Sequence, residues 1–167
     1  MIVLILMVAL AGIPFSSPHS FQAAGSWRTY RGAWFEIKYP ANFAVRPSLP
    51  SSTSTRGYDS VFFTAPDGSV EFYVFSPQWN GTPSDIEINP LSEVLVSQEI
   101  TQNFGKTIRR ATVRALDGSY SRSFEDTEEA TTNTRKVFGI RYANLASYNR
   151  YKSAYLTFKA SLAQFSD

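Results

Sequence analysis

Residues 60–76, SVFFTAPDGSVEFYVFS, decide the fold of this chain. Two runs rich in aromatic and β-branched residues, Ser60 to Ala65 and Val70 to Ser76, flank the turn sequence Pro66-Asp67-Gly68. Such runs favour extended structure, and an Asp-Gly pair is typical of a tight turn between antiparallel strands. We therefore predict a β-hairpin here, which Pro77 ends.

The residues before this hairpin extend the predicted sheet. Phe35-Glu36-Ile37-Lys38-Tyr39 alternates apolar and charged residues, as a half-buried strand does, and Pro40 ends it. A second extended segment runs from Phe43 to Val45 and closes at Pro47. Both segments are predicted to belong to the same antiparallel sheet, because consecutive strands are joined by short turns.

Three further strands are predicted in the second half of the chain. Thr107 to Leu116 leads through Asp117-Gly118 into Ser119 to Phe124. The Thr-rich and acidic stretch from Glu125 to Thr134 is interpreted as a surface loop, because it has little apolar area to bury. Lys136 to Tyr142 then alternates as the last strand.

Two segments show helical periodicity. Asn89-Pro90 opens a segment in which Leu91, Val94, Leu95 and, less regularly, Ile100 and Phe104 can share one helix face. Gly105 is a typical stop. A second apolar stripe runs to the end of the chain, through Leu145, Tyr148, Tyr151, Tyr155, Phe158, Leu162 and Phe165. The predicted fold class is therefore α+β, a single domain over residues 25–167 with an antiparallel sheet layered between helices.

Residues 1–24 resemble a secretory signal peptide. They contain no Lys, Arg, Asp or Glu, and Ile2 to Ile13 is an almost unbroken apolar run. The alternatives are an uncleaved N-terminal anchor and a buried hydrophobic segment, but about a dozen residues are too few to span a membrane as a helix. We expect cleavage, no transmembrane anchor after it, and export to a periplasm, a thylakoid lumen or the extracellular space.

Composition excludes several chemistries once residues 1–24 are removed. The chain has no cysteine, and its only histidine is His19. A Ser-His-Asp triad, a Cys-His pair and a common zinc site are then impossible. The chain also lacks a glycine-rich phosphate loop, and its net charge of +2 is too mild to indicate a nucleic-acid partner. We expect no enzyme activity and no cofactor, although hydrolysis by a pair of carboxylates stays open in principle.

The acidic run at the start of the predicted loop offers oxygen atoms that could hold Ca²⁺. It comprises Glu125, Asp126, Glu128 and Glu129, but it lacks the alternating spacing and central glycine of a calcium loop. We interpret it as solvated surface and expect no metal site.

The pattern Gly32-x-x-Phe35-x-Ile37-x-Tyr39-Pro40-x-x-Phe43-x-Val45 resembles the opening of the PsbP/Mog1-like family. The Phe63 to Gly68 turn, the central helix and the terminal helix after Phe138 to Tyr142 resemble the same layout. The resemblance implies an antiparallel sheet between helices and a non-catalytic binding or assembly role. Family members include extrinsic photosystem subunits, GTPase-binding proteins and secreted bacterial proteins. Histidines that some photosystem members use have no counterpart here.

Two features are candidate partner-binding residues. Trp79 and Asn80 lie among turn residues, and loop tryptophans are common binding anchors. The alternative is that Trp79 closes over the hydrophobic core. Arg110, Arg114 and Arg122 lie on two adjacent predicted strands and could grip an anionic partner if they share a face. The alternative for them is cross-strand pairing with acids of the same sheet.

The sequence favours an exported, non-catalytic accessory protein that docks on a protein partner or a membrane-associated assembly. The alternative is a small-ligand carrier or a weak carboxylate-dependent hydrolase with a pocket between sheet and helix. Aromatic residues expected to line such a pocket are Tyr120, Phe138, Tyr142, Tyr148 and Tyr155. A deep cavity with convergent polar groups would favour the alternative.

Overall fold

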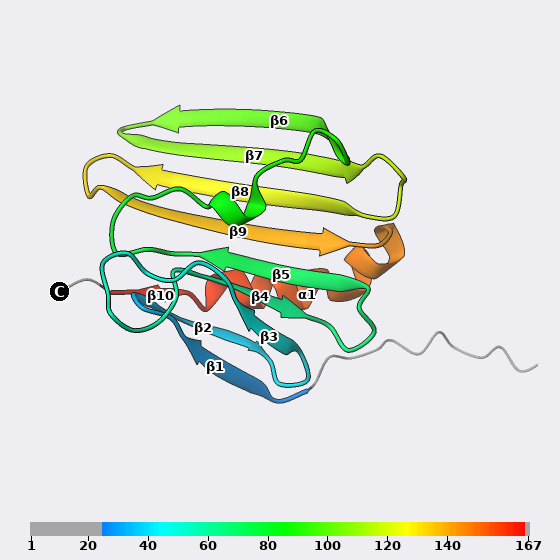
Figure 1. Ribbon diagram of the computed structural model, residues 1–167, viewed down its shortest axis with the longest axis horizontal. Helices are drawn as coiled ribbons and strands as arrows, with labels where there is room; N and C mark the ends of the chain where they lie inside the picture. The colour runs from blue at the N-terminus through cyan, green and yellow to red at the C-terminus, as the bar shows by residue number, and fades with distance from the viewer. Residues whose placement is uncertain (1–24, 166–167) are drawn as a thin grey trace, which may run out of the picture.

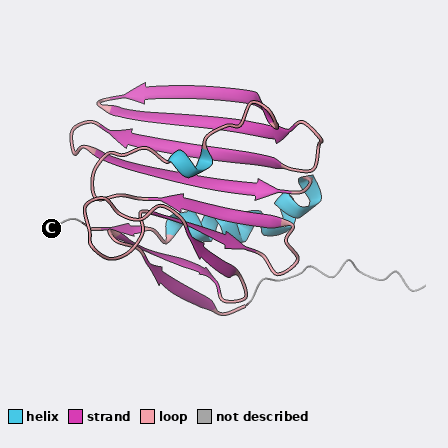
Figure 2. Cartoon of the chain, viewed as in Figure 1, coloured by secondary structure: helices cyan, strands magenta, loops and turns pink. Residues whose placement is uncertain are grey.

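The computed structural model describes residues 25–165, which form two antiparallel sheets and a single α-helix (Figures 1 and 2). The larger sheet has seven strands, in the spatial order β3 (Ala44–Pro47), β4 (Ser60–Thr64), β5 (Val70–Phe75), β9 (Thr134–Tyr142), β8 (Ser121–Glu129), β7 (Lys106–Ala115) and β6 (Glu93–Asn103). The smaller sheet has the order β1 (Trp27–Arg31), β2 (Phe35–Pro40) and β10 (Ala163–Gln164). The helix α1 spans Leu145–Ala160, and a short 3₁₀ helix, η1, spans Ser84–Ile86.

The predicted hairpin at residues 60–76 is confirmed. β4 and β5 pair from Ser60 opposite Phe75 to Thr64 opposite Glu71. Gly68 adopts a φ of +66° in the turn, a backbone conformation that glycine takes without steric cost. The strands β4 and β5 alternate between two buried faces, which is why nearly every residue of the hairpin is apolar.

The main core lies between the large sheet, α1 and the small sheet. Side chains from one face of β4, β5 and β9, including Phe63, Phe72 and Phe138, pack against Phe158 of α1 and Phe35 of β2. The helix packs on β2, β5 and β9. Figure 1 shows α1 behind β4 and β5, while β6 and β7 continue the sheet beyond the helix.

The opposite face of the large sheet carries a second, smaller core of Phe62, Tyr73, Phe75 and Val137. Gly139 lies among these residues, and an added Cβ there would come within 2.7 Å of the Phe124 ring. The missing side chain therefore makes room for Phe124 to lie on the sheet. The segment from 77 to 92, which includes η1, crosses this face in front of β8 and β9 (Figure 1).

The helix predicted from Asn89 to Gly105 is wrong, because these residues form the edge strand β6. Val94, Val96, Ile100 and Thr101 are β-branched, and such residues favour strands over helices. Their pairing with β7 across a tight turn outweighs the weak helical spacing.

Gly105 ends the segment as predicted, but in a hairpin turn. Phe104 and Gly105 have φ of 43° and 79°, respectively, which matches the left-handed geometry of a two-residue hairpin connection. The same left-handed preference of glycine therefore serves a β-turn here rather than a helix end.

The predicted layering of the sheet between helices is wrong, because only one face of the large sheet is covered by an α-helix. One face of the large sheet has α1 and the small sheet, whereas the other has the 77–92 segment and its short η1. The fold class α+β with antiparallel strands is confirmed, but the single predicted sheet is wrong, because β2 lies in the small sheet and β3 in the large one. The acidic loop from Glu125 to Thr134 is also corrected, because Glu125 to Glu129 belong to β8.

The terminal helix is confirmed over Leu145–Ala160 and ends earlier than its apolar stripe. Asn144 caps it, and its side chain accepts a hydrogen bond from the Ser147 backbone N–H at 2.9 Å. Beyond the helix, Ala163 and Gln164 pair with β2 as β10. The strand β1 was not predicted from the sequence.

Candidate functional site

The three arginines proposed as a binding group do not share one face of the sheet. Arg110 and Arg114 point to the side of α1, whereas Arg122 lies opposite Val113 and points to the other side. Paired residues in a sheet point to the same face and neighbours along a strand alternate, so register alone separates Arg122 from the others. Arg110 pairs with Glu125, its Nε donating to Oε2 at 3.0 Å. Arg110 therefore pairs with an acidic residue of the neighbouring strand, as the alternative to partner binding predicts.

Arg122 is the centre of a buried polar network. Its Nε and Nη2 donate to the Glu93 carboxylate at 2.7 and 2.6 Å. Its Nη1 and Nη2 also donate to the backbone carbonyls of Ile86 and Glu87, at 2.8 and 3.0 Å. The Tyr120 hydroxyl donates to the same Glu93 carboxylate at 2.8 Å. With its donors used inside the chain, Arg122 holds the 77–92 segment on the sheet.

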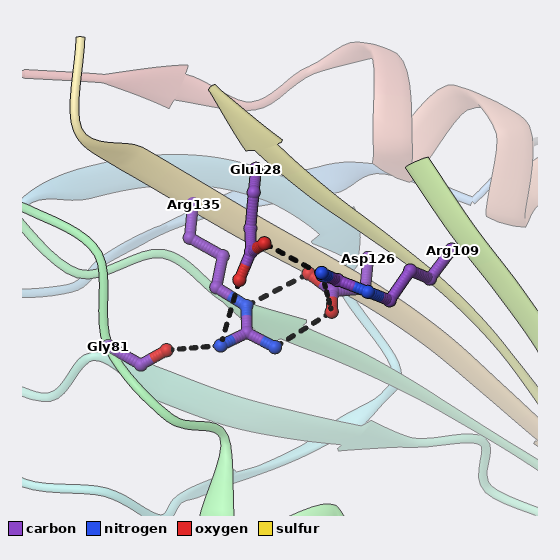
Figure 3. A network of polar contacts seen from close by, with 5 residues as sticks. All are labelled: Gly81, Arg109, Asp126, Glu128 and Arg135. Atoms are coloured by element: carbon purple, nitrogen blue, oxygen red, sulfur yellow. Dashed lines mark hydrogen bonds and ion pairs between the residues drawn. The ribbon is translucent and has the colours of Figure 1, made fainter. Parts of the chain in front are cut away.

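A second network fixes the same segment at its other end (Figure 3). Arg135 donates from Nε and Nη2 to the Asp126 carboxylate at 2.9 and 2.7 Å, and from Nη1 to the Gly81 carbonyl at 2.6 Å. Arg109 and Glu128 complete the group, with an ion pair of 2.8 Å between them. The acidic residues interpreted as solvated surface therefore form ion pairs across β7, β8 and β9.

Asp85 of η1 supplies a third attachment. Its carboxylate accepts hydrogen bonds from the Ser60 hydroxyl at 2.6 Å and from the Tyr73 hydroxyl at 2.7 Å. Burial raises the pKa of Tyr73, and the charge of Asp85 adds to that effect. The Tyr73 hydroxyl therefore keeps its proton and remains a donor to Asp85.

Trp79 lies on the surface of this anchored segment. The residue is 42% exposed and is a member of neither core, although it lines a pocket together with Phe75 of the smaller core. The two interpretations of Trp79, a binding anchor or a cover over the core, stay predictions. Next to it, the Asn80 backbone N–H donates to the Asn133 carbonyl at 2.7 Å. The indole is therefore presented to solvent by a backbone that is fixed on both sides.

A groove of about 390 Å³ lies where the sheet extends past α1. Tyr148 and Tyr155 line it from the helix, as the pocket alternative predicts. Phe138 lies inside the main core, and Tyr120 lies on the opposite face of the sheet. Tyr142 packs against the main core, and its ring centre lies 5.1 Å from that of Tyr148.

Three of the four charged residues that line this groove, Arg110, Glu125 and Lys159, are paired with one another. Glu125 accepts a hydrogen bond from Lys159 Nζ at 2.7 Å and another from Arg110 at 3.0 Å. Burial acts to raise the pKa of Glu125, but these two cations outweigh it and lower that pKa. A general acid in hydrolysis needs a raised pKa, so Glu125 has the wrong shift for that role.

The strand β6 forms one edge of the large sheet and is exposed along almost its whole length. Ten of its 11 residues, all except Glu93, are exposed. They include four aliphatic side chains with exposed fractions from 40% to 54%: Val94, Leu95, Val96 and Ile100. A strand with no neighbour on one side presents unpaired backbone N–H and C=O groups. The sequence analysis did not identify this exposed edge, because it predicted a helix for these residues.

Within residues 25–165, no group of three or more His, Cys, Asp or Glu side chains is placed to hold a metal ion. Nor does that part of the chain contain a helix long and apolar enough to cross a membrane.

The architecture defines an α+β protein with a PsbP-like fold, and comparison with solved structures supports this description. The solution structure of cyanobacterial PsbP (CyanoP) from Synechocystis sp. PCC 6803 matches with a TM-score of 0.52 and 15% identity. The match covers 91% of this chain and 99% of that one. The layout resemblance to PsbP-type proteins is therefore confirmed at the level of the fold.

A crystal structure from Bacteroides thetaiotaomicron VPI-5482 also matches, with a TM-score of 0.43 and 17% identity, over 86% of this chain and 49% of that one. No family model matches this chain, and no curated protein matches it.

Proposed function

We propose that this protein is an exported, non-catalytic accessory protein that docks on a larger protein assembly through the edge strand β6. The single observation that carries the proposal is the exposure of β6 along almost its whole length. An extended segment of the partner would add to β6 as an eighth strand of the large sheet. Backbone hydrogen bonds would supply affinity, and the exposed aliphatic side chains would supply contact area.

The sequence of β6 supports strand addition. Exposed edges in native proteins usually carry Lys, Pro or a bulge, which prevent pairing with another chain. The bulge in β6 lies between Leu95 and Ser97, and residues 97–103 keep a regular register with β7. These seven residues contain neither Lys nor Pro. The part of the edge after the bulge is therefore open to a partner strand.

The candidate binding residues occupy different places around this edge. Arg114 lies on β7 beside β6 and points to the side of α1, where its charge could meet an acidic group of the partner. Arg110 lies on the same side but is paired with Glu125. Trp79 and Asn80 lie on the opposite face, on the 77–92 segment, and we assign them to a separate contact.

Hydrolysis has less support than docking. A general acid and a general base must both be free to exchange protons. In the groove beside α1, Glu125 is held as a carboxylate by Lys159 and Arg110. The groove fits the small-ligand carrier alternative better than it fits a hydrolase. Both carboxylate oxygens of Glu125 already accept hydrogen bonds, from Lys159 and from Arg110.

Docking through β6 predicts that a charge placed on the edge strand weakens capture of the partner. Ile100→Lys and Val96→Lys should each weaken capture about 10-fold or more, because hot-spot side chains contribute more than about 1 kcal/mol. The measurement is quantitative affinity capture from an extract of the native compartment. Folding should change by less than about 0.5 kcal/mol, since both side chains are on the surface.

The matched control is Leu156→Lys on α1, because Leu156 is 54% exposed and does not line the groove between α1 and β6. This variant should capture the partner as the wild type does. Equal capture by wild type and by the Val96→Lys and Ile100→Lys double variant would overturn docking through β6.

Export rests on residues 1–24, which lie outside the described residues. Intact-mass measurement of the native protein is expected to show the loss of roughly two dozen residues, as removal of a signal peptide requires. A full-length chain in a soluble cytoplasmic fraction would contradict export and leave the docking test unaffected.

A further inference from the structure

We infer that the pocket beside Trp79 binds an organic cation, an alkylammonium or alkylguanidinium group, through Asp59 and the indole. The pocket has a volume of about 270 Å³ and lies between the 49–59 segment and the Trp79 loop. It is separate from the β6 edge, so this inference does not depend on the proposed function. The residues that carry the argument are Thr53, Asp59, Phe75, Pro77 and Trp79, all of which line the pocket.

Asp59 is a buried carboxylate without a full set of partners. The residue is only 6% exposed, and its Oδ1 has no hydrogen-bond partner. Its backbone is fixed, because its N–H donates to the Leu49 carbonyl and its C=O accepts from the Ser76 N–H, both at 2.8 Å. Buried polar atoms are almost always paired, so an unpaired one on the wall of a pocket indicates a missing ligand.

Burial also raises the pKa of Asp59, although the Ser51 hydroxyl and the Ser52 backbone act to lower it. A cation bound beside the carboxylate would compensate the loss of hydration that burial causes. The charge of Asp59 therefore becomes less costly when the pocket is occupied.

The charge of the residues that line the pocket favours a positively charged ligand. Asp59 is the only charged residue among those that line it, and no Lys or Arg lies on its walls. The other polar walls are hydroxyl and amide groups such as Thr53 and Asn80. A cation would be attracted and an anion repelled, with little screening at a buried carboxylate.

The apolar walls suit the alkyl part and the delocalised charge of such a ligand. Trp79, Phe75 and Pro77 all line the pocket, and the face of an indole attracts ammonium and guanidinium groups. The loop is held in place before binding, because the Gly81 carbonyl accepts from Arg135 at 2.6 Å. A rigid aromatic wall reduces the entropy lost on binding.

Gly81 brings the loop close to the aromatic floor of the pocket. A Cβ added there would lie 3.3 Å from the Phe75 ring and 3.6 Å from Pro77. The small volume excludes drug-sized molecules, which usually need at least about 300 Å³. It leaves room for one charged head group and a short alkyl chain.

Titration of the folded protein with four butyl compounds tests the site, followed by ¹H–¹⁵N NMR of the backbone and indole signals. Butylguanidinium and butylammonium chloride should shift the signals of Trp79 and its neighbours in a saturable way. Uncharged butyramide should bind at least 10-fold more weakly, and sodium butyrate should not bind. Equal binding of butyramide and butylammonium would overturn the inference, because the pocket would then be only apolar.

Two variants measure how much Asp59 and Trp79 each contribute to binding. Asp59→Asn should weaken butylguanidinium binding at least 10-fold while leaving the melting temperature equal or higher, because a buried unpaired charge is removed. Trp79→Ala should weaken it about 5-fold without unfolding the protein, since Trp79 is a member of neither core. Unchanged binding in both variants would overturn the assignment.

Asp67→Asn and Phe104→Ala are matched controls, because both residues lie in exposed hairpin turns outside the pocket. Both controls should bind the cations as the wild type does. A short peptide with a central arginine and blocked ends distinguishes the source of the cation. Tighter binding of the peptide than of butylguanidinium assigns the pocket to a protein side chain, and the reverse order assigns it to a free amine.

Discussion

Replacing Phe158 with alanine is expected to lower the free energy of unfolding by about 3–5 kcal/mol, the usual cost of truncating a buried aromatic residue. Phe158 is fully buried in α1. Its ring lies 5.4 and 5.3 Å, centre to centre, from those of Phe63 and Phe72, and 6.2 Å from those of Phe138 and Tyr155. The side chain therefore joins the helix to β4, β5 and β9, and its loss leaves a cavity in the middle of the main core.

Thermal and urea unfolding measure this effect. The melting temperature is expected to fall by roughly 10 °C, given the usual shift per kcal/mol in a domain of this size. Leu156→Ala is the control on the same helix, because Leu156 is 54% exposed and its loss should cost less than about 0.5 kcal/mol. A Phe158→Ala variant as stable as Leu156→Ala would mean that α1 does not hold the sheet in solution.

The second large effect is expected at the buried ion pair on the other face. Arg122→Ala should lower the free energy of unfolding by about 3 kcal/mol, because it leaves the Glu93 carboxylate buried without its partner. The side chains of Arg122 and Glu93 are only 11% and 5% exposed. The carbonyls of Ile86 and Glu87 would also lose their donor. Urea unfolding near neutral pH measures the loss.

Arg110→Ala is the matched control on the same sheet. Arg110 also pairs with a glutamate across the sheet, but its side chain is 48% exposed. Exposed ion pairs contribute at most about 1 kcal/mol, so this variant should remain close to the wild type. Equal losses in the two variants would contradict the difference in burial.

The pH dependence of the Arg122→Ala effect gives a further check on its cause. Burial acts to raise the pKa of Glu93, but hydrogen bonds from Arg122, Tyr120 and the Asn89 backbone hold it below its usual 4.5. A lowered pKa in the folded state gives stability that is present above the unfolded pKa and lost as pH falls through the folded one. The difference between wild type and Arg122→Ala should therefore shrink below about pH 4. A constant difference would point to lost packing instead.

The local parts of this fold follow from the sequence alone. The hairpin at 60–76 is specified by its turn residues and by strands that are apolar on both faces. The helix α1 is specified by an aromatic stripe and by the Asn144 cap. Short turns with Gly68 and Gly118 at positive φ fix antiparallel neighbours. Each of these signals acts over a few residues, so no distant contact is needed to interpret it.

The choice between helix and strand at residues 89–105 was decided by tertiary structure. Leu91, Val94 and Leu95 fit a helix by spacing, yet β6 forms because β7 and its turn offer a partner for 10 of its 11 residues. Pairing of neighbouring strands outweighs a weak helical preference, which amounts to tenths of a kcal/mol per residue. Strand pairing also explains the acidic run, because in β8 its carboxylates pair with arginines of β7 and β9 and with Lys106.

Some properties of the candidate sites also follow from the sequence, whereas others depend on tertiary structure. The sequence by itself determined an antiparallel α+β domain, and it contains no Cys anywhere and no His after residue 24. Only the tertiary structure decided that Arg122 faces away from Arg110, since a strand's register sets which face each side chain takes. It also placed Asp59 beside Trp79, 20 positions further along the chain. Burial and proximity between distant segments are properties of the packed chain, and no local pattern of residues encodes them.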